Sequence, residues 1–110
     1  MKISELIAYV DEVKPSAFSD AVKISWLNDI EGMIQTDVML LDVSEVISYT
    51  VADMDATPLV SPPHDRLYRS YLCALADLTN GEYNKYNNTM TVFNAQYNQY
   101  VAWYTARFRP

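Results

Sequence analysis

The side chains best suited to catalysis are few in this chain and have no evident partners. His64 is the only histidine and Cys73 the only cysteine among the 110 residues. His64 lies beside two prolines at a predicted helix start, where a surface or capping role fits better than that of a general base. Cys73 lies in a regular apolar stretch, which predicts a small buried side chain, because reactive thiols need an accessible, electropositive site. We therefore predict that the protein is not an enzyme.

Metal and cofactor sites are not indicated either. Asp53 and Asp55, and the stretch 42–45, offer carboxylates, but they lack the glycine and the distal glutamate of a calcium loop. The chain has only two glycines, Gly32 and Gly81, which is too few for a phosphate-binding loop or a dinucleotide fingerprint. One cysteine provides neither an internal disulfide nor a thiolate zinc cage. We expect no metal and no cofactor.

Composition points to one globular domain over residues 1–110. Half of the residues are apolar and 20% are charged, so a compact core can form. No apolar run approaches the roughly 20 residues of a membrane span, so we expect no membrane contact. A single cysteine favours the cytosol as the default compartment.

Charge is distributed unevenly along the chain. The formal net charge is −6, which argues against nonspecific binding of nucleic acid. Residues 1–60 contain eleven acidic and three basic side chains, whereas residues 61–110 contain three acidic and five basic ones. The opposite signs are open to three interpretations: attraction within the fold, head-to-tail docking of copies, or solvated faces without function.

Two apolar patterns predict helices before residue 40. In the first, apolar residues share one helix face up to Pro15, and Ser4 or a neighbour is expected to cap the start. The second starts at residues 16–20 with Phe18 as a hydrophobic staple and continues to about residue 40. Gly32 within it indicates either close packing against a neighbouring backbone or simple tolerance. The positions on the two stripes are Ile3, Leu6, Ile7 and Val10, and then Lys23, Trp26, Leu27, Ile30, Met33 and Ile34.

The helical pattern is lost from Asp42 to Pro63. Residues 46–51 are rich in β-branched and aromatic side chains, whereas aspartates and prolines interrupt the rest. We predict a long irregular connection that contains one or two short strands. A connection of this length in a small domain is uncommon without a function, often contact with a partner.

Two further helices are predicted in the C-terminal half. Residues 61–65 form a start signal, in which Ser61 can cap and Asp65 suits the positive end of the helix dipole. Asn80 and Gly81 end that helix, and the next begins at Glu82. So tight a break predicts an antiparallel helical hairpin. The fold class predicted is therefore mainly all-α, with four helices.

The last helix has an aromatic face and an amide face. The aromatic and apolar side chains recur mostly every three or four residues, and a core-facing role is the simplest interpretation. The other face lacks the Glu and Lys of an ordinary exposed helix, and we predict that it binds another chain, with Asn87 and Asn94 as candidate interface residues. The apolar set is Tyr83, Tyr86, Met90, Phe93, Tyr97, Tyr100, Val101, Tyr104 and Phe108, and the amides are Asn84, Asn87, Asn88, Asn94, Gln96, Asn98 and Gln99.

The last turn of this helix is a second candidate interface. Its aromatic and basic side chains are Trp103, Tyr104, Arg107, Phe108 and Arg109, and these residue types dominate interface hot spots. The arginines also suit the negative end of the helix dipole. Docking of a partner and stabilisation of the helix end therefore both remain open.

Four stretches of the C-terminal half are residues 67–72 after the proline-rich helix start, residues 81–88, residues 93–97 and the pair Trp103-Tyr104. Together they resemble the head–tail connector (adaptor) family of tailed phages and prophages. Residues 23–27 are also similar to the N-terminal helices of that group. The resemblance covers most of the chain and is weakest over residues 42–60.

The resemblance implies a mainly helical structural subunit without an active site. Such a subunit assembles as a homo-oligomeric ring under the portal and extends the DNA channel towards the tail or its stopper. DNA would pass without sequence-specific binding, and the protein would be in the host cytoplasm during assembly and then at the head–tail junction of the virion. The alternative is a small acidic helical module that masks a basic, DNA-binding protein; self-association distinguishes the two.

Overall fold

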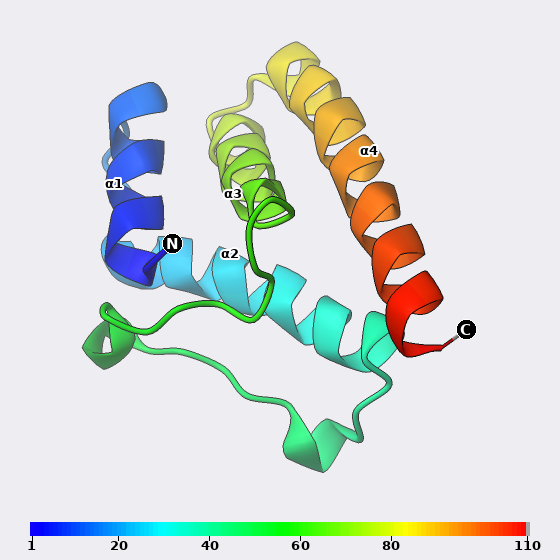
Figure 1. The fold of residues 1–110 in the computed structure, drawn as a ribbon. Coiled ribbons are helices and arrows are strands. Elements are labelled where there is room, and N and C mark those ends of the chain that lie inside the picture. Colours follow the sequence, from blue (N-terminus) through cyan, green and yellow to red (C-terminus); the bar gives the residue numbers. More distant parts are fainter. Residues whose placement is uncertain (110) are drawn as a thin grey trace.

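The computed structural model describes residues 1–109 and is built from four α-helices (Figure 1). These are α1 (Ile3–Val13), α2 (Asp20–Met33), α3 (Arg66–Thr79) and α4 (Tyr83–Phe108). A π-helical turn, η1 (Ile34–Val38), extends α2, and two short 3-10 helices, η2 (Val43–Glu45) and η3 (Val51–Asp53), lie in the connection. The predicted mainly all-α fold with four helices is confirmed.

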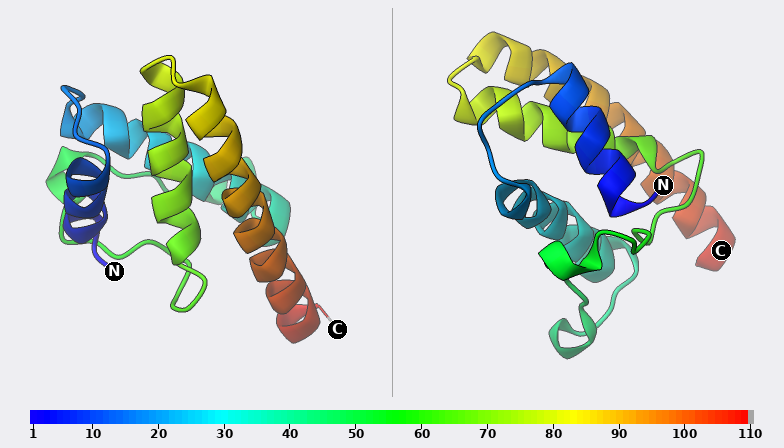
Figure 2. Two further views of the ribbon diagram at one scale, coloured as in Figure 1. Left: turned by 90° about the horizontal axis from the view of Figure 1, so that it is seen from above. Right: turned by 90° about the vertical axis from the view of Figure 1, so that its left-hand side faces the viewer.

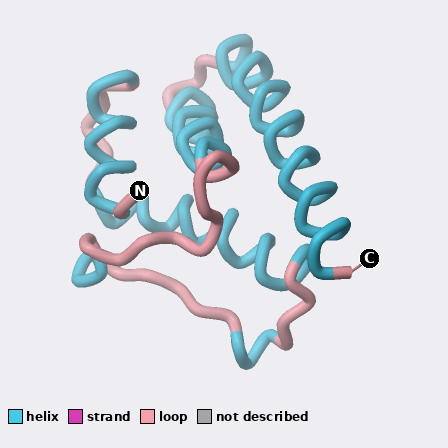
Figure 3. The backbone as a smooth tube through the Cα atoms, viewed as in Figure 1, coloured by secondary structure: helices cyan, strands magenta, loops and turns pink. Residues whose placement is uncertain are grey.

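The four α-helices surround one hydrophobic core, and each of them contributes side chains to it. Helices α3 and α4 lie side by side as the predicted antiparallel hairpin, α1 packs beside α3, and α2 crosses below them (Figures 1 and 2). The core residues Leu6, Ile30, Leu72 and Phe93, one from each helix, are 3% exposed or less. The connection from residue 39 to residue 65 runs along the far side of α2 before it returns to start α3 (Figure 3).

Helix α1 is capped both by neighbours of Ser4 and by the connection, so the prediction of a neighbouring cap is right and Ser4 itself is not the cap. The backbone N–H of Ile3 donates to the carbonyl of Ala56, and that of Ser4 donates to the carbonyl of Met54, both at 2.9 Å. Glu5 Oε1 accepts from the N–H of Lys2 at 2.9 Å. Two first-turn N–H groups, which have no partner within a helix, are thus satisfied from residues at least fifty positions away.

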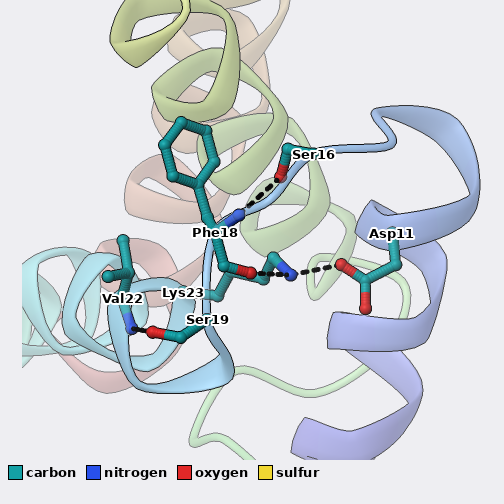
Figure 4. A network of polar contacts seen from close by, with 6 residues as sticks. All are labelled: Asp11, Ser16, Phe18, Ser19, Val22 and Lys23. Carbon is teal, nitrogen blue, oxygen red and sulfur yellow. Dashed lines mark hydrogen bonds and ion pairs between the residues drawn. The ribbon is translucent and has the colours of Figure 1, made fainter.

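The start of α2 follows the predicted pattern. Ser19 Oγ accepts from the N–H of Val22 at 3.3 Å, and the ring of Phe18 packs edge-on against Trp26 with centroids 5.6 Å apart. Lys23, on the predicted buried stripe, is only 3% exposed. Its ammonium group donates to the Phe18 carbonyl and pairs with Asp11 of α1 (Figure 4). Both partners satisfy the buried charge, so a lysine can occupy this position.

Gly32 lies near the C-terminal end of α2, at a position with room for a side chain. A Cβ atom added at this glycine would meet nothing within 4 Å, so the tolerance interpretation is right and close packing is wrong. The helical path continues through η1 to residue 38, near the predicted end at about residue 40. Leu40 then adopts a φ of 58°, which turns the chain away from α2.

The hairpin forms as predicted, with Asp65 as the N-cap residue of α3 and with one correction, at Ser61. The helix begins at Arg66, and Ser61 contributes its carbonyl, which accepts from the His64 N–H at 3.0 Å, rather than a capping side chain. The carboxylate of Asp65 lies 3.8 Å from the N-terminal amino group of Met1. At the other end, Gly81 has a φ of +76° and ends α3, as glycine does at a helix C-terminus.

The strands predicted in the connection do not form within residues 1–109; side chains of α2 and η1 pair with this backbone instead. The Asn28 amide donates to the Tyr49 carbonyl at 2.9 Å and accepts from the Tyr49 N–H at 2.8 Å. Gln35 does the same with Ile47, at 2.9 Å in both directions. Each side-chain amide forms the same two hydrogen bonds, one donated and one accepted, that a residue of a neighbouring strand would form in an antiparallel sheet. The segment is extended without being part of a sheet.

Candidate partner-binding site

The C-terminal end of α4 and the connection form an apolar groove, here named the terminal groove. Trp103, Tyr104 and Phe108 line it from α4, and Met39 and Leu59 line it from the connection, around a volume of about 200 Å³. Trp103 is 42% and Phe108 56% exposed. The structure therefore brings together three predicted interface residues and adds two apolar residues from the connection.

Aromatic contacts fix the inner wall of the terminal groove. The centroid of the His64 ring lies 5.2 Å from that of Trp103 and 5.7 Å from that of Tyr100. His64 therefore belongs to this aromatic cluster and is partly exposed, so of the two predicted roles the surface one holds in part and the capping one is wrong. Burial, and next the neighbouring Tyr104, raise the pKa of Tyr100 to about 12, so its hydroxyl is neutral near neutral pH.

The two terminal arginines have different positions. Arg109 donates from Nη2 to the Val38 carbonyl at 2.7 Å, and its guanidinium lies 5.8 Å from the centroid of the Tyr104 ring. Arg107 is exposed, with its guanidinium 5.9 Å from the centroid of Phe108. Arg109 thus ties the last turn of the chain to η1, while Arg107 adds positive charge beside the aromatic rings.

Asn87 and Asn94 are both exposed and form a second surface, separate from the terminal groove. They are seven residues apart, almost two helical turns, and so share one side of α4. Trp103 follows Asn94 by nine residues, or two and a half turns, and so faces the opposite side. The predicted interface residues are therefore divided between this side of α4, here named the amide surface, and its C-terminal end.

Two of the predicted amides face α3 instead. Gln96 Oε1 accepts from the Ser70 hydroxyl at 2.7 Å, and Gln99 Oε1 accepts from Arg66 Nη2 at 3.1 Å.

The aromatic stripe of α4 is only partly in the core. Phe93 and Tyr100 are buried, whereas Tyr83 at the start of α4 is 64% exposed. The core interpretation holds for the middle of the helix and is wrong at both ends.

A buried carboxylate that the sequence analysis did not identify holds the connection beside the groove. Glu31 of α2 is fully buried. Its Oε2 accepts from the Tyr49 hydroxyl at 2.7 Å and from the Leu59 N–H at 3.0 Å, and its Oε1 accepts from the Tyr68 hydroxyl at 2.5 Å. Tyr68 in turn accepts from the Val60 N–H at 2.9 Å. These bonds place Leu59, a wall of the groove, relative to α2 and α3.

Burial and the negative charge of Glu31 act together on its tyrosine partners. Desolvation, with the Glu31 carboxylate next in size, raises the pKa of both Tyr49 and Tyr68 well above the ordinary tyrosine range. Both hydroxyls therefore stay protonated and act as donors to the carboxylate. The sequence signal was the position of Glu31, four residues after Leu27 on the apolar stripe of α2, where a carboxylate must be buried with partners.

The remaining candidate residues have structural roles. Cys73 is buried as predicted, and burial raises the pKa of its thiol. Asp53 Oδ2 accepts from the Thr50 N–H at 2.8 Å, which caps η3. Within residues 1–109, no group of three or more His, Cys, Asp or Glu side chains is placed to hold a metal ion. No helix in this same range is long and apolar enough to cross a membrane.

Comparison with known proteins gives no match: no family model, no curated protein and no solved structure matches the chain. The functional argument therefore depends on the surfaces described above.

Proposed function

We propose that this chain is a non-enzymatic structural subunit of the head–tail connector of a tailed phage or prophage. Copies assemble as a ring under the portal protein and extend the DNA channel towards the tail or its stopper protein. The observation that carries this proposal is the surface of α4, which is exposed over much of its length yet lacks charge.

The argument starts from the side chains of α4. The helix has 26 residues, which corresponds to about 39 Å, and no charged residue occurs between Lys85 and Arg107. Isolated exposed helices normally carry charged side chains on the solvent side, whereas the centres of protein interfaces are depleted of them. An exposed, charge-free surface of this length is suited to repeated contacts between subunits.

The acidic N-terminal part suits a channel for DNA. Residues 1–60 contain eleven of the fourteen acidic side chains. If this part faces the channel, its negative potential repels the phosphates, so DNA passes without adhering. Tight retention of DNA by the assembled ring at moderate salt would refute this orientation. The proposal places the protein in the host cytoplasm during assembly and at the head–tail junction in the virion, without membrane contact.

Assembly is the property to test. Light scattering over a concentration series, with electron microscopy of the concentrated sample, should show a monomer or small oligomer when dilute and rings when concentrated. Asn87→Glu and Asn94→Glu should leave the monomer folded and weaken assembly, because each places a charge on the amide surface. Ala8→Glu is the control, since it adds the same charge at an exposed position of α1.

Two results would contradict the proposal. A strictly monomeric chain that also fails to retain the portal protein encoded beside it in a pull-down is not a connector. A monomer that instead captures a DNA-binding protein would establish the acidic masking module in its place. Glutamate variants that unfold the monomer but leave assembly intact would show that the two faces of α4 are assigned the wrong way round.

A further inference from the structure

The connection projects a small acidic and apolar protrusion, here named the acidic knob (residues 42–47). Its centre is η2, which extends away from the four helices (Figures 1 and 2). Val43 is 79% and Ile47 47% exposed, and the carboxylates of Asp42 and Glu45 flank Val43 at exposed positions. The knob thus presents apolar side chains within a negative border.

The knob has a defined shape although it is exposed. Asp42 Oδ2 accepts from both the N–H and the hydroxyl of Ser44, and these two bonds hold the pKa of the Asp42 carboxyl below its usual range. At its other end, Ile47 is held by the Gln35 amide. Docking such a preformed turn requires little ordering of the chain.

The terminal groove has the complementary character. Its aromatic rings offer an apolar floor, and the guanidinium groups of Arg107 and Arg109 lie beside them. A third arginine, Arg66 of α3, donates to Gln99, one helical turn before Trp103. The exposed carboxylate of Asp37 in η1 is the acidic group on this side. The border of the groove is therefore mainly positive, opposite to that of the knob.

We propose that the acidic knob of one copy of this chain docks into the terminal groove of a second copy. The proposal rests on the proposed function and assigns a second contact between neighbouring subunits, beside the one at the amide surface of α4. Because Val43 is 79% exposed, the knob is not seated in the groove of its own chain and is free to dock on another molecule. Complementary charge and matching apolar centres select a second copy as that molecule.

The geometry of this contact determines how copies assemble. Knob and groove are different surfaces, so the contact is heterologous and leaves one free knob and one free groove after each step. Such contacts form a closed ring when the rotation between neighbours closes, and an open chain when it does not. A ring-shaped connector needs a contact of this kind.

The test separates knob and groove with two single variants. Val43→Glu places a charge at the centre of the knob, and Phe108→Glu places one in the groove. Each should weaken self-association, measured by analytical ultracentrifugation, by about tenfold or more. Val22→Glu, the same change at a partly exposed position of α2, is the control and should leave association unchanged. Thermal unfolding of each variant verifies that it is folded.

Mixing the two variants gives a signature specific to head-to-tail docking. The Val43→Glu chain keeps an intact groove and the Phe108→Glu chain keeps an intact knob. An equimolar mixture should therefore form one-to-one pairs that grow no further, while the wild type grows beyond the dimer. Glu45→Arg combined with Arg107→Glu should restore association that either change alone weakens.

The outcomes distinguish this contact from the proposed function as a whole. If the wild type forms rings and both glutamate variants form them equally well, knob and groove are not the contact, whereas the connector proposal stands. If the wild type stops at a dimer, the heterologous arrangement is wrong. If it neither self-associates nor binds the portal, the proposed function fails together with this inference.

Discussion

Replacing Glu31 by alanine should be one of the most damaging single changes in this chain. It removes the acceptor of three donors at once: the hydroxyls of Tyr49 and Tyr68 and the N–H of Leu59. A buried donor left without a partner costs about 1–3 kcal/mol. Leu59 is partly exposed and the hydroxyls can rotate, so we take the lower end for each and add the cavity left by the side chain. The expected loss is about 3–5 kcal/mol, against the roughly 5–15 kcal/mol that stabilises a small domain.

Urea unfolding followed by circular dichroism measures this loss. Glu31→Gln keeps the shape but replaces one acceptor oxygen by a donor, and should cost about 1–3 kcal/mol. Glu12→Ala, at an exposed position of α1, is the control and should change stability by less than about 0.5 kcal/mol. Hydrogen exchange of the Leu59 and Val60 amides should accelerate in Glu31→Ala. The reasoning is refuted if the unfolding free energy of Glu31→Ala is within about 1 kcal/mol of the wild type, because two buried hydroxyls and one partly buried N–H without partners should together cost more than that.

Three further outcomes follow from individual groups. The folded-state pKa of Tyr100 is raised from 10.0 to about 12, so the stability that its burial contributes is complete below pH 10 and is lost as the pH rises towards 12. Urea unfolding midpoints measured over this pH range, together with tyrosinate absorbance, should show this loss. A midpoint that does not change with pH would contradict it. Gly32→Ala should stabilise the chain by up to about 1 kcal/mol, because a Cβ atom added there meets nothing within 4 Å. Gly81→Ala should destabilise it by a similar amount, because Gly81 has a positive φ. Equal unfolding midpoints for the two variants would show that neither backbone argument applies. Cys73 is buried with a raised thiol pKa, so a thiol reagent should label it only as fast as the protein opens, and rapid labelling of the native protein would count against that burial.

The helices were predictable because their causes are local. The three- and four-residue steps from Met90 to Tyr104 identify α4, and the pair Asn80-Gly81 identifies the break before it. Cys73 follows from its apolar neighbours in the same way. Periodicity and turn chemistry act over a few residues, so one sequence contains enough information to apply them.

The arrangement of the connection was not predictable, because its partners are distant in sequence. Tyr68 reaches Glu31 across 37 positions and Tyr49 reaches Asn28 across 21. Pairing of a side-chain amide with a backbone leaves no periodic pattern, so residues 46–51 had the appearance of a strand. The terminal groove also depends on these contacts, since Leu59 belongs to it only because Glu31 holds the adjacent backbone.

The amide pairs made by Asn28 of α2 and Gln35 of η1 bear on aggregation. Residues 46–51, Val-Ile-Ser-Tyr-Thr-Val, contain no charge, proline or glycine, which is the composition of segments that stack into fibrils. An extended segment of this kind exposes N–H and C=O groups that recruit other strands. At Ile47 and Tyr49 those groups are already occupied by Gln35 and Asn28. The side chains of α2 and η1 thus take the place that a second molecule would otherwise fill, and the chain keeps this fibril-prone segment paired with itself.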